Sequence, residues 1–578
     1  MHKFLILAGL FILLSAPATA QTNTNSITIG DRHVVLNPEN TRSLYQLGKV
    51  WGFIKYFHPS ITEAKKDWDT ELINFLPGYL NAGSQLDRND SLLNWIARLG
   101  DIPPVVAPDY HTLEAPKLLP DFSWISEQEL GQALTKKLQT VLVHRQQGDQ
   151  RYIKFFRTEG LNIPVFQNEK RFPAAEWSKP AVRLLALFRF WNAMEYWYPY
   201  KYNLPVSWDR ILSTGINEFL QAGSPEAYNL AIMRLVTALH DGHGFVTSAV
   251  ANNMMGAYYL PVRFNYVQGQ VIISSISKDS VAAAAGLSVG DIVESIDGRS
   301  IKEILEEKLL ITPGSTRAYQ LYFICVNLNR STSPTTLLGI RKKKKRLVIT
   351  VPNELNKGRV DPYVPAFALQ KDSSLSMRDK GILYLNMGKL TMNEDSARLV
   401  QLLEKSSALI IDARQNAIED PKRPNVIGLL EEWICEGKQP YVFSTGQPEY
   451  AGAFLLAKDS APPFKPHAAR YNKPVVILIN EEAISVGEFM SMLFSQAPGA
   501  ILMGSATAGA DGPSSYFQLP GDVYAGFTGT GIYWKDGRET QRVGIRPDVE
   551  VLPTIKGFRQ NRDELVEKAV RYLTRKMK

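Results

Sequence analysis

The spacing of apolar side chains divides the chain into three kinds of segment. In residues 41–101 and 181–241, apolar positions recur every three to four residues, which is the period of an amphipathic helix, while the spacer at about 110–180 has a mixed pattern that predicts no element. Residues 258–353 instead carry short apolar runs between turns, which predict short strands. After about residue 380, apolar runs such as residues 382–385, 408–411, 475–479 and 501–503 alternate with helical patterns. This alternation predicts parallel strands in an α/β layer.

Residues 41–101 and 181–241 resemble each other, which indicates an internal duplication. VWGFIKYFHP in the first segment aligns with FWNAMEYWYP in the second at an offset of 140 positions. The same offset relates Trp51 to Trp191, Tyr56 to Tyr196, Pro59 to Pro199, Trp68 to Trp208 and Asp69 to Asp209. The copies diverge at their ends, where the first reads LGDIPPVV and the second reads LHDGHGFV. His243 therefore faces Pro103 in the alignment, and we expect it to lie outside the packing that the copies share.

Residues 475–512 hold the strongest candidate for a nucleophile. The apolar run 475–479 predicts a buried strand, and a helical pattern begins at Val486. Ser485 thus stands at a helix start, where free backbone N–H groups and the positive helix end can hold a developing oxyanion. Serine is also a preferred helix N-cap, so the local pattern alone leaves both roles open.

The N-terminus and the composition bear on location. The chain has 578 residues, of which 45% are hydrophobic and 21% charged, and this predicts several folded domains. Lys3, the apolar stretch LILAGLFILL and the small residues 18–20 predict a secretory signal over residues 1–20. We therefore expect an exported protein, periplasmic or extracellular. No later run is long and apolar enough to span a bilayer, and export conflicts with a nucleic-acid partner.

The charged residues and the cysteines do not indicate a further binding or metal site of their own. The densest basic run, residues 341–346 (RKKKKR), lies between apolar stretches and predicts the solvated tip of a β-hairpin, with a patch for an anionic membrane or polyanion as the alternative. Cys325 and Cys435 lie far apart in different predicted domains, so we expect neither a disulfide nor a metal cluster. No metal or cofactor is expected.

Residues 271–298 (VIISSISKDSVAAAAGLSVGDIVESIDG) resemble the second half of a PDZ domain. The resemblance rests on Ala285, Gly286 and Leu287, followed by Gly290 and Asp291 and a short apolar strand. PDZ domains commonly bind extended chain ends by strand addition. The resemblance implies a peptide-binding module, or alternatively a domain that serves only as a structural lid.

Four further motifs, taken with this module, resemble the C-terminal processing and tricorn-core serine peptidases. They are D-x-R-x-N at residues 412–416, NEEAISVGEF at residues 480–489, and G-x-x-T-x-G at 504–509 with G-I-x-P-D at 544–548. The resemblance implies a multidomain α+β and α/β fold with duplicated helical N-terminal units, a PDZ-like β domain and a crotonase/ClpP-like core of stacked ββα units. The expected domains are a signal peptide at 1–20, a first helical repeat at 21–110, a connecting region at 111–180, a second helical repeat ending in the histidine loop at 181–257, a PDZ-like domain at 258–353 and a peptidase core at 354–578.

The resemblance places the catalytic serine on Ser485. The processing branch takes its base from a lysine whose position here is Ala510, so a Ser–Lys dyad is rejected. The tricorn branch uses a histidine ahead of the PDZ domain in a D-S-H pattern. This pattern matches residues 241–243 and makes His243 the general base, because a serine hydroxyl needs a nearby proton acceptor. His240 is the alternative base.

Two positions depart from the tricorn relay. The serine beside the histidine is replaced by Gly242, and the glutamate near the C-terminus corresponds to Gln541. Gln541 can orient a group by hydrogen bonding but supplies no negative charge to an imidazolium. Asp241 and Glu488 are the candidates for the missing anion.

The expected oxyanion hole combines two backbone amides. Val486 follows the nucleophile and supplies the first donor. The second comes from the loop near Asn416, where Ile418 and Glu419 replace the glycines of the family. Any residue other than proline can donate its amide, so the hole survives if the loop keeps its path.

These observations favour an exported serine endopeptidase in which a PDZ module binds the substrate chain. The alternative is a catalytically inactive scaffold that binds peptides or small apolar ligands. A structural envelope protein is a third class, and export disfavours a crotonase-like acyl transferase because it removes coenzyme A. The expected partner is a peptide or protein substrate, and the oligomeric state stays open.

Overall fold

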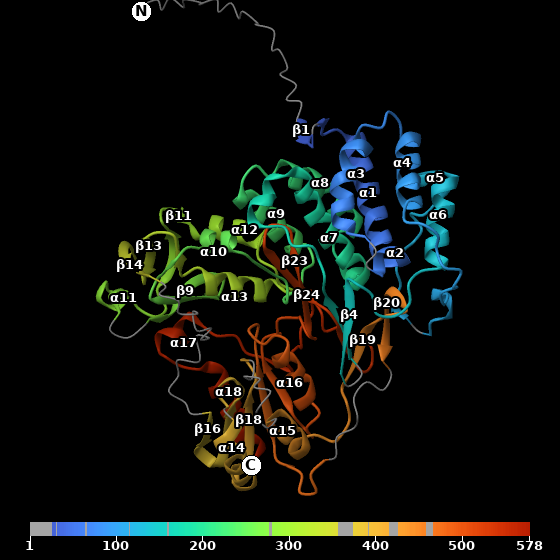
Figure 1. Cartoon of the computed structure of the whole chain (residues 1–578). Coiled ribbons are helices and arrows are strands. Elements are labelled where there is room, and N and C mark those ends of the chain that lie inside the picture. The colour runs from blue at the N-terminus through green and yellow to red at the C-terminus, as the bar shows by residue number, and fades with distance from the viewer. Residues whose placement is uncertain are drawn as a thin grey trace, which may run out of the picture.

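Figure 1 shows the computed structural model of the chain. The structure describes residues 26–30, 32–63, 66–114, 116–158, 161–276, 280–355, 374–390, 392–415, 426–457 and 466–578. The predicted signal segment, residues 1–20, lies outside these residues. Helices fill the N-terminal part, a β-rich part follows, and an α/β core forms the C-terminal part (Figure 1). The multidomain α+β architecture expected from the sequence is confirmed.

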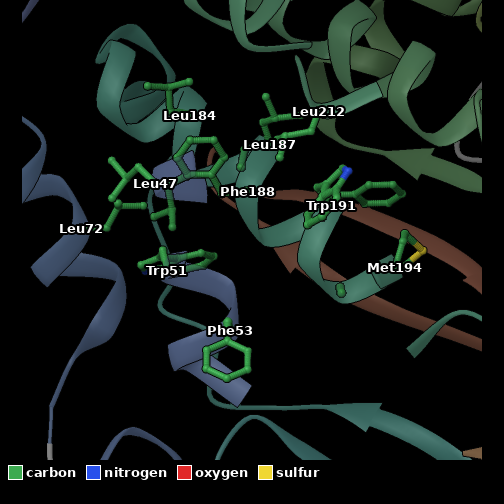
Figure 2. Close-up of a cluster of buried hydrophobic side chains, with 14 of the residues drawn as sticks. Leu47, Trp51, Phe53, Leu72, Leu184, Leu187, Phe188, Trp191, Met194 and Leu212 are labelled. Carbon is green, nitrogen blue, oxygen red and sulfur yellow. The ribbon is translucent and has the colours of Figure 1, made fainter. Parts of the chain in front are cut away.

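The N-terminal helices form two related groups. After a short hairpin, β1 (Ser26–Ile29) and β2 (Arg32–Val35), the first group comprises α1 (Pro38–Phe57), α2 (Pro59–Thr62), α3 (Trp68–Leu80) and α4 (Gln85–Ala97). The second comprises α7 (Pro180–Trp197), α8 (Trp208–Gln221) and α9 (Pro225–Thr237). Both α1 and α7 begin with proline, which fits the first turn of a helix. Figure 2 shows apolar side chains of α1 and α7 packed together, among them Leu47, Trp51, Phe188 and Trp191.

The same tryptophan pair recurs in each group. Trp51 and Trp68 each donate the indole N–H to the other's backbone carbonyl, at 3.2 and 2.9 Å. Trp191 and Trp208 make the same reciprocal pair at 2.8 and 3.0 Å. All four rings are buried, so each pair satisfies its polar N–H groups inside an apolar core. These two units are the first copy and the second copy of the duplication.

Contacts between the copies exchange under a two-fold operation. Lys49 of the first copy pairs with Asp209 of the second at 3.0 Å. Arg189, which aligns with Lys49, pairs with Asp69, which aligns with Asp209, at 2.8 Å. Such reciprocal contacts define the interface of a two-fold dimer, so the copies pack as an intramolecular pseudo-dimer.

Aligned positions meet along the line where α1 and α7 cross. The rings of Tyr56 and Tyr196 meet edge to face at 5.8 Å. A Cβ added at Gly52 would lie 1.8 Å from the side chain of Asn192, its aligned residue. The Asn192 amide donates to the carbonyl of Gly48 at 3.0 Å. Glycine in the first copy thus makes room for the larger residue in the second.

The connecting region joins the copies and also reaches the core. It contains β3 (Pro116–Leu118), α5 (Glu127–Leu130), α6 (Gln132–Val143) and the hairpin of β4 (Ile153–Thr158) and β5 (Leu161–Phe166). Strand β3 completes a sheet of order β25-β19-β20-β3. The other members are β19 (Tyr441–Gln447), β20 (Tyr450–Ala457) and β25 (Gly531–Trp534). The N-terminal and C-terminal parts of the chain therefore share one sheet.

The β-rich part is built on a sheet of order β14-β13-β10-β9-β8, with β11 (Arg299–Ser300) paired to β10. Its strands are β8 (Val262–Val267), β9 (Gln270–Ile276), β10 (Ile292–Ile296), β13 (Thr335–Lys342) and β14 (Lys345–Pro352). The helices are α10 (Ala249–Met255), α11 (Val281–Ala284), α12 (Ile301–Leu309) and α13 (Arg317–Asn327), and β7 (Tyr258–Tyr259), β12 (Arg330–Ser331) and β15 (Glu354–Leu355) form a small separate sheet. Lys343 and Lys344 turn between β13 and β14, which confirms the predicted basic hairpin tip.

The core sheet has the order β16-β17-β18-β21-β22-β26 and is parallel from β17 to β26. Its strands are β16 (Leu375–Arg378), β17 (Ile382–Asn386), β18 (Ala408–Asp412), β21 (Val475–Ile479), β22 (Ile501–Gly504) and β26 (Val549–Glu550). Apolar side chains of α15 (Val426–Ile434) and α16 (Val486–Phe494) cover one face and those of α18 (Glu564–Lys576) the other, while α14 (Met392–Lys405) and α17 (Ile555–Arg559) complete the core. The predicted parallel strands are confirmed, because uniform apolar runs suit burial on both faces.

A third sheet of order β23-β24-β6 brings the second copy to the core. Its strands are β23 (Ser514–Leu519), β24 (Val523–Thr528) and β6 (Phe245–Thr247), the last following the His243 loop directly.

Cys325 and Cys435 are both buried and free. Within the described part of the chain, no helix is long and apolar enough to cross a membrane.

Candidate active site

Ser485 occupies a strained turn between β21 and α16. Its φ is 55° and its ψ is −115°, a left-handed conformation that side-chain-bearing residues rarely adopt. Such a residue costs on the order of 1–3 kcal/mol and tends to occur at functional sites. Ser485 holds the N-cap position, yet its side chain makes no capping hydrogen bond, and the residue is only half-buried. The serine therefore stands at the helix start as expected, but its hydroxyl does not cap the helix.

Glu488 anchors the loop beside this turn. Its buried carboxyl accepts hydrogen bonds from Thr507 Oγ1 at 2.5 Å and from the amides of Gly509 and Ala510 at 2.9 and 2.8 Å. Burial raises the pKa of Glu488 to about 7, and burial next to Glu488 raises the pKa of Asp511 well above its usual range. Glu488 thus fixes the glycine-rich loop, and its hydrogen bonds to that loop do not reach His243.

The histidine loop packs directly against the serine turn. A Cβ added at Gly242 would lie 2.8 Å from the Cβ of Ala510 and 3.1 Å from Ile484, the residue before Ser485. The amide of Ser485 donates to the carbonyl of Ala510 at 3.0 Å. The small side chains at 242 and 510 therefore let the loop that carries His243 approach the turn that carries Ser485.

A hydrogen-bond chain orients the imidazole of His243. Its Nδ1 lies 2.9 Å from Thr528 Oγ1, and that hydroxyl donates to Asp241 Oδ1 at 2.8 Å. Because a hydroxyl has one proton and here gives it to the carboxylate, it can only accept from Nδ1–H. This series of hydrogen bonds assigns the imidazole proton to Nδ1 and leaves the Nε2 lone pair available as a proton acceptor.

Asp241 is the buried anion at the end of this series of hydrogen bonds. Its second oxygen accepts from the Thr528 amide at 2.6 Å, and its Oδ1 also accepts from the amide of His243 at 3.1 Å. Burial lowers the pKa of His243, and the charge of Asp241 opposes that shift only in part. The imidazole is therefore neutral at neutral pH, which is the form a general base requires.

Gln541 contacts the anion and not the imidazole. Its Nε2 donates to Asp241 Oδ1 at 3.2 Å and to Ser315 Oγ at 3.3 Å. Ser315 Oγ in turn accepts the amide of Gly242 at 2.7 Å. Gln541 thus holds the carboxylate and the histidine loop in place, and the negative charge lies on Asp241, one of the two candidates from the sequence.

The sequence did not reveal Thr528. It lies in GFTGTG, which matches no motif, and it reaches His243 only because β24 pairs with β6. Gly526 lies opposite Phe245 in that pairing, so Thr528, the last residue of β24, meets His243, two residues before β6 begins. No local pattern carries this information, because 285 positions separate the two residues.

The oxyanion candidates are only partly described. Val486 begins α16 next to Ser485, which leaves its amide at the open N-terminus of the helix. Asn416, Ile418 and Glu419 lie outside the described residues. The strand end before them is fixed: although burial opposes its ionisation, Arg414 at 2.6 Å holds the pKa of Asp412 below its usual range.

His240 lies on the same loop as His243. It is half-buried, has a φ of 47°, and its amide bonds to the carbonyl of Thr237 at 3.0 Å. Burial, with the nearby charge of Arg542, lowers its pKa. In the part of the chain that the structure describes, the hydrogen bonds to Thr528 and Asp241 involve His243 and not His240.

Comparison with known proteins identifies two regions of the chain. Residues 381–551 match peptidase family S41, and residues 272–318 match the PDZ domain. A protein of Chlamydia muridarum, described as uncharacterized, is 31% identical over 98 residues, which is 16% of this chain and 16% of that one. The match therefore spans about one sixth of the length of that relative.

Solved structures resemble the fold at low identity. A CPAF mutant is 13% identical with a TM-score of 0.51, and the similarity covers 69% of this chain and 98% of that one. The photosystem II D1 C-terminal processing protease is 14% identical with a TM-score of 0.35, covering 64% of this chain and 92% of that one. The likeness to the CPAF structure concerns the fold.

Proposed function

The chain carries a domain of peptidase family S41, a family of serine peptidases, and on this premise we propose that it is an exported serine endopeptidase. Ser485 Oγ attacks the scissile carbonyl while His243 Nε2 takes the hydroxyl proton. The C–N bond then breaks, and His243 returns that proton to the leaving amine. Water, deprotonated in the same way, hydrolyses the acyl-enzyme and restores Ser485. The Val486 amide, with a second amide near Asn416, stabilises each tetrahedral oxyanion.

The observation that carries this proposal is the chain from His243 through Thr528 to Asp241. Hydroxyl and carboxylate groups fix the tautomer whose Nε2 accepts a proton, and Asp241 stabilises the imidazolium that forms. The strained, uncapped Ser485 supports the same assignment, because its side chain is not used by the helix. Gln541 acts on this chain through Asp241, as a positioning residue.

Fluorophosphonate labelling of the full mature chain, with the adduct mapped by mass spectrometry, tests the nucleophile. We expect an adduct on Ser485 that disappears in Ser485→Ala and in His243→Ala, while both variants keep the wild-type circular dichroism. Ser495→Ala, at the other end of the same helix, is the matched control and should label normally. Absence of labelling in folded wild-type protein would contradict the proposal.

The second candidate is an inactive scaffold that binds peptides or small apolar ligands. It is favoured by the positions where this chain departs from the relay, Gly242 and Gln541. Its signature is a Ser485→Ala variant with full ligand affinity and full function in cells. Export is proposed from the pattern of residues 1–20, and N-terminal sequencing of the mature protein should begin at Gln21.

A further inference from the structure

The sheet β23-β24-β6 has one face in the core and one face in solvent. Phe517 and Phe527 point into the core shared with the N-terminal helices and are 3% and 0% exposed. Tyr516, Tyr524 and Phe245 lie on the other face and are 61%, 36% and 38% exposed. Three exposed aromatic rings on one small sheet form an apolar surface that folding does not use.

The strand register makes this surface continuous. Tyr516, Gly526 and Phe245 occupy one row across the three strands. A Cβ added at Gly526 would lie 2.1 Å from the Phe245 ring, so the glycine lets that ring lie across the middle strand. The ring centroids of Phe245 and Tyr516 are 6.5 Å apart. Tyr524 lies in the next row, between Gln518 and Thr247.

The aromatic surface begins at the proposed catalytic groups. Strand β6 starts two residues after His243, and β24 ends at Thr528, which bonds to His243. Tyr524 is four residues before Thr528, which is about 13 Å along a strand. An extended chain of about four residues spans the same distance. Figure 1 shows β23 and β24 in the middle of the molecule, between the N-terminal helices and α16.

We propose that this surface binds the substrate, an extended polypeptide segment with uncharged, apolar side chains, and leads it to Ser485. This inference rests on the proposed peptidase function. The side chains that the strands place on this face are uncharged, and the carboxylate of Asp522 in the β23–β24 turn accepts from Gln518 at 3.0 Å at one end of it: the strand residues are Phe245, Thr247, Ser514, Tyr516, Gln518 and Tyr524.

The chemistry of the surface selects this occupant. Aromatic rings bury apolar side chains without requiring one sequence, while a charged side chain placed against them loses hydration. Among the described strands, β6 pairs only with β24, and helices α9 and α10 pack against it, so the proposed contact with substrate is through the aromatic face of the sheet. The peptidase would therefore prefer apolar stretches that folded proteins keep buried.

Peptide binding to the full-length chain carrying Ser485→Ala tests the surface without turnover. The probes are two fluorescent unstructured peptides of equal length with blocked ends, one rich in Leu and Val, the other with those residues replaced by Glu. We expect the apolar peptide to bind at least about tenfold tighter. Adding Tyr516→Ser and Tyr524→Ser should weaken the apolar peptide at least about tenfold and leave the acidic peptide unchanged.

Leu86→Ser is the matched control, because Leu86 is 67% exposed on α4 of the first copy. It should leave the affinity unchanged. Tyr516→Gln alone provides a milder variant. Circular dichroism should show that this variant and the double tyrosine variant are folded. Wild-type affinity in the double variant would overturn the inference. A change in molecular mass by light scattering, with peptide affinity kept, would also overturn it and assign the surface to contact between copies.

Fluorophosphonate labelling separates this inference from the proposed function. In the Tyr516→Ser and Tyr524→Ser variant with Ser485 intact, the small probe should react at the wild-type rate, because it does not need the surface. A protein that binds the apolar peptide through these tyrosines but never labels at Ser485 would support the surface and remove the peptidase.

Discussion

The two copies of the duplicated helical unit share their packing and differ in their ends. Both keep a reciprocal tryptophan pair, and both contribute one cation and one aspartate to the interface between them. At the end of the first copy Asp101 is exposed, and Pro103 follows it. At the end of the second, Asp241 is buried and holds Thr528 and the His243 loop. The copies thus share the residues that pack, and only the second ends in the buried aspartate and the histidine loop proposed for catalysis.

The two aligned ion pairs between the copies also differ in how deeply they are buried. Arg189 of the second copy is fully buried and bonds both Asp69 and Glu169. The aligned residue of the first copy, Lys49, pairs with Asp209, whose side chain is 52% exposed. Breaking the two aligned ion pairs should therefore lower the free energy of unfolding by different amounts, because a charge left unpaired costs more when it is buried.

The largest difference between the copies is expected in the rate of reaction. Asp241→Asn should lower the rate of peptide hydrolysis by about 10²–10⁴-fold, because the amide cannot accept both Thr528 hydrogen bonds and stabilise the imidazolium. The aligned Asp101→Asn should change it less than about twofold. Steady-state kinetics on both variants provides the measurement. Equal effects in the two copies would remove Asp241 from the mechanism.

The second largest difference between the copies is expected in the free energy of unfolding that each interface ion pair contributes. Among the described ion pairs, Arg189→Met leaves buried Asp69 and Glu169 with one cation, Lys55, and should cost about 3–5 kcal/mol. Lys49→Met leaves Asp209 in contact with water and should cost about 1 kcal/mol or less. Urea unfolding of both variants measures the difference. A cost for Lys49→Met that matches Arg189→Met would show that the exposure of the partner does not decide it.

The tryptophan pairs should respond alike. Trp51→Phe and Trp191→Phe each remove one buried indole hydrogen bond and should each cost about 1 kcal/mol. The two losses of unfolding free energy should agree within about 0.5 kcal/mol, the usual spread for one hydrogen bond. A clear inequality would mean that the copies no longer share their packing.

The smallest expected effect is a pH shift confined to the second copy. Burial lowers the pKa of His243, so labelling of Ser485 should be high at neutral pH and fall as the pH drops below about 6.5, the unperturbed value for histidine. The charge of Asp241 raises this pKa, so the midpoint should move lower still in Asp241→Asn. Asp101→Asn should leave it in place. A midpoint above 6.5 in the wild type would contradict the burial argument.

Local patterns predicted the elements and motifs, and long-range pairing supplied the rest. The core strands were predictable because both of their faces are buried, which gives uninterrupted apolar runs. Ser485, Val486 and His243 stand in short continuous motifs. Gln541 occupies the aligned glutamate position, but its bond to Asp241 joins residues 300 positions apart. Strand β3 could not be placed for the same reason, because it forms only by joining β20.

The groups proposed for catalysis are far apart in the sequence, and this has a consequence for biosynthesis. His243 and Ser485 are synthesised before Thr528 and Gln541, which follow both of them in the chain. Until β24 pairs with β6, nothing fixes the tautomer of the imidazole. A chain still leaving the ribosome therefore carries the proposed nucleophile without an oriented base. In the proposed mechanism, completion of the fold would act as the activation step.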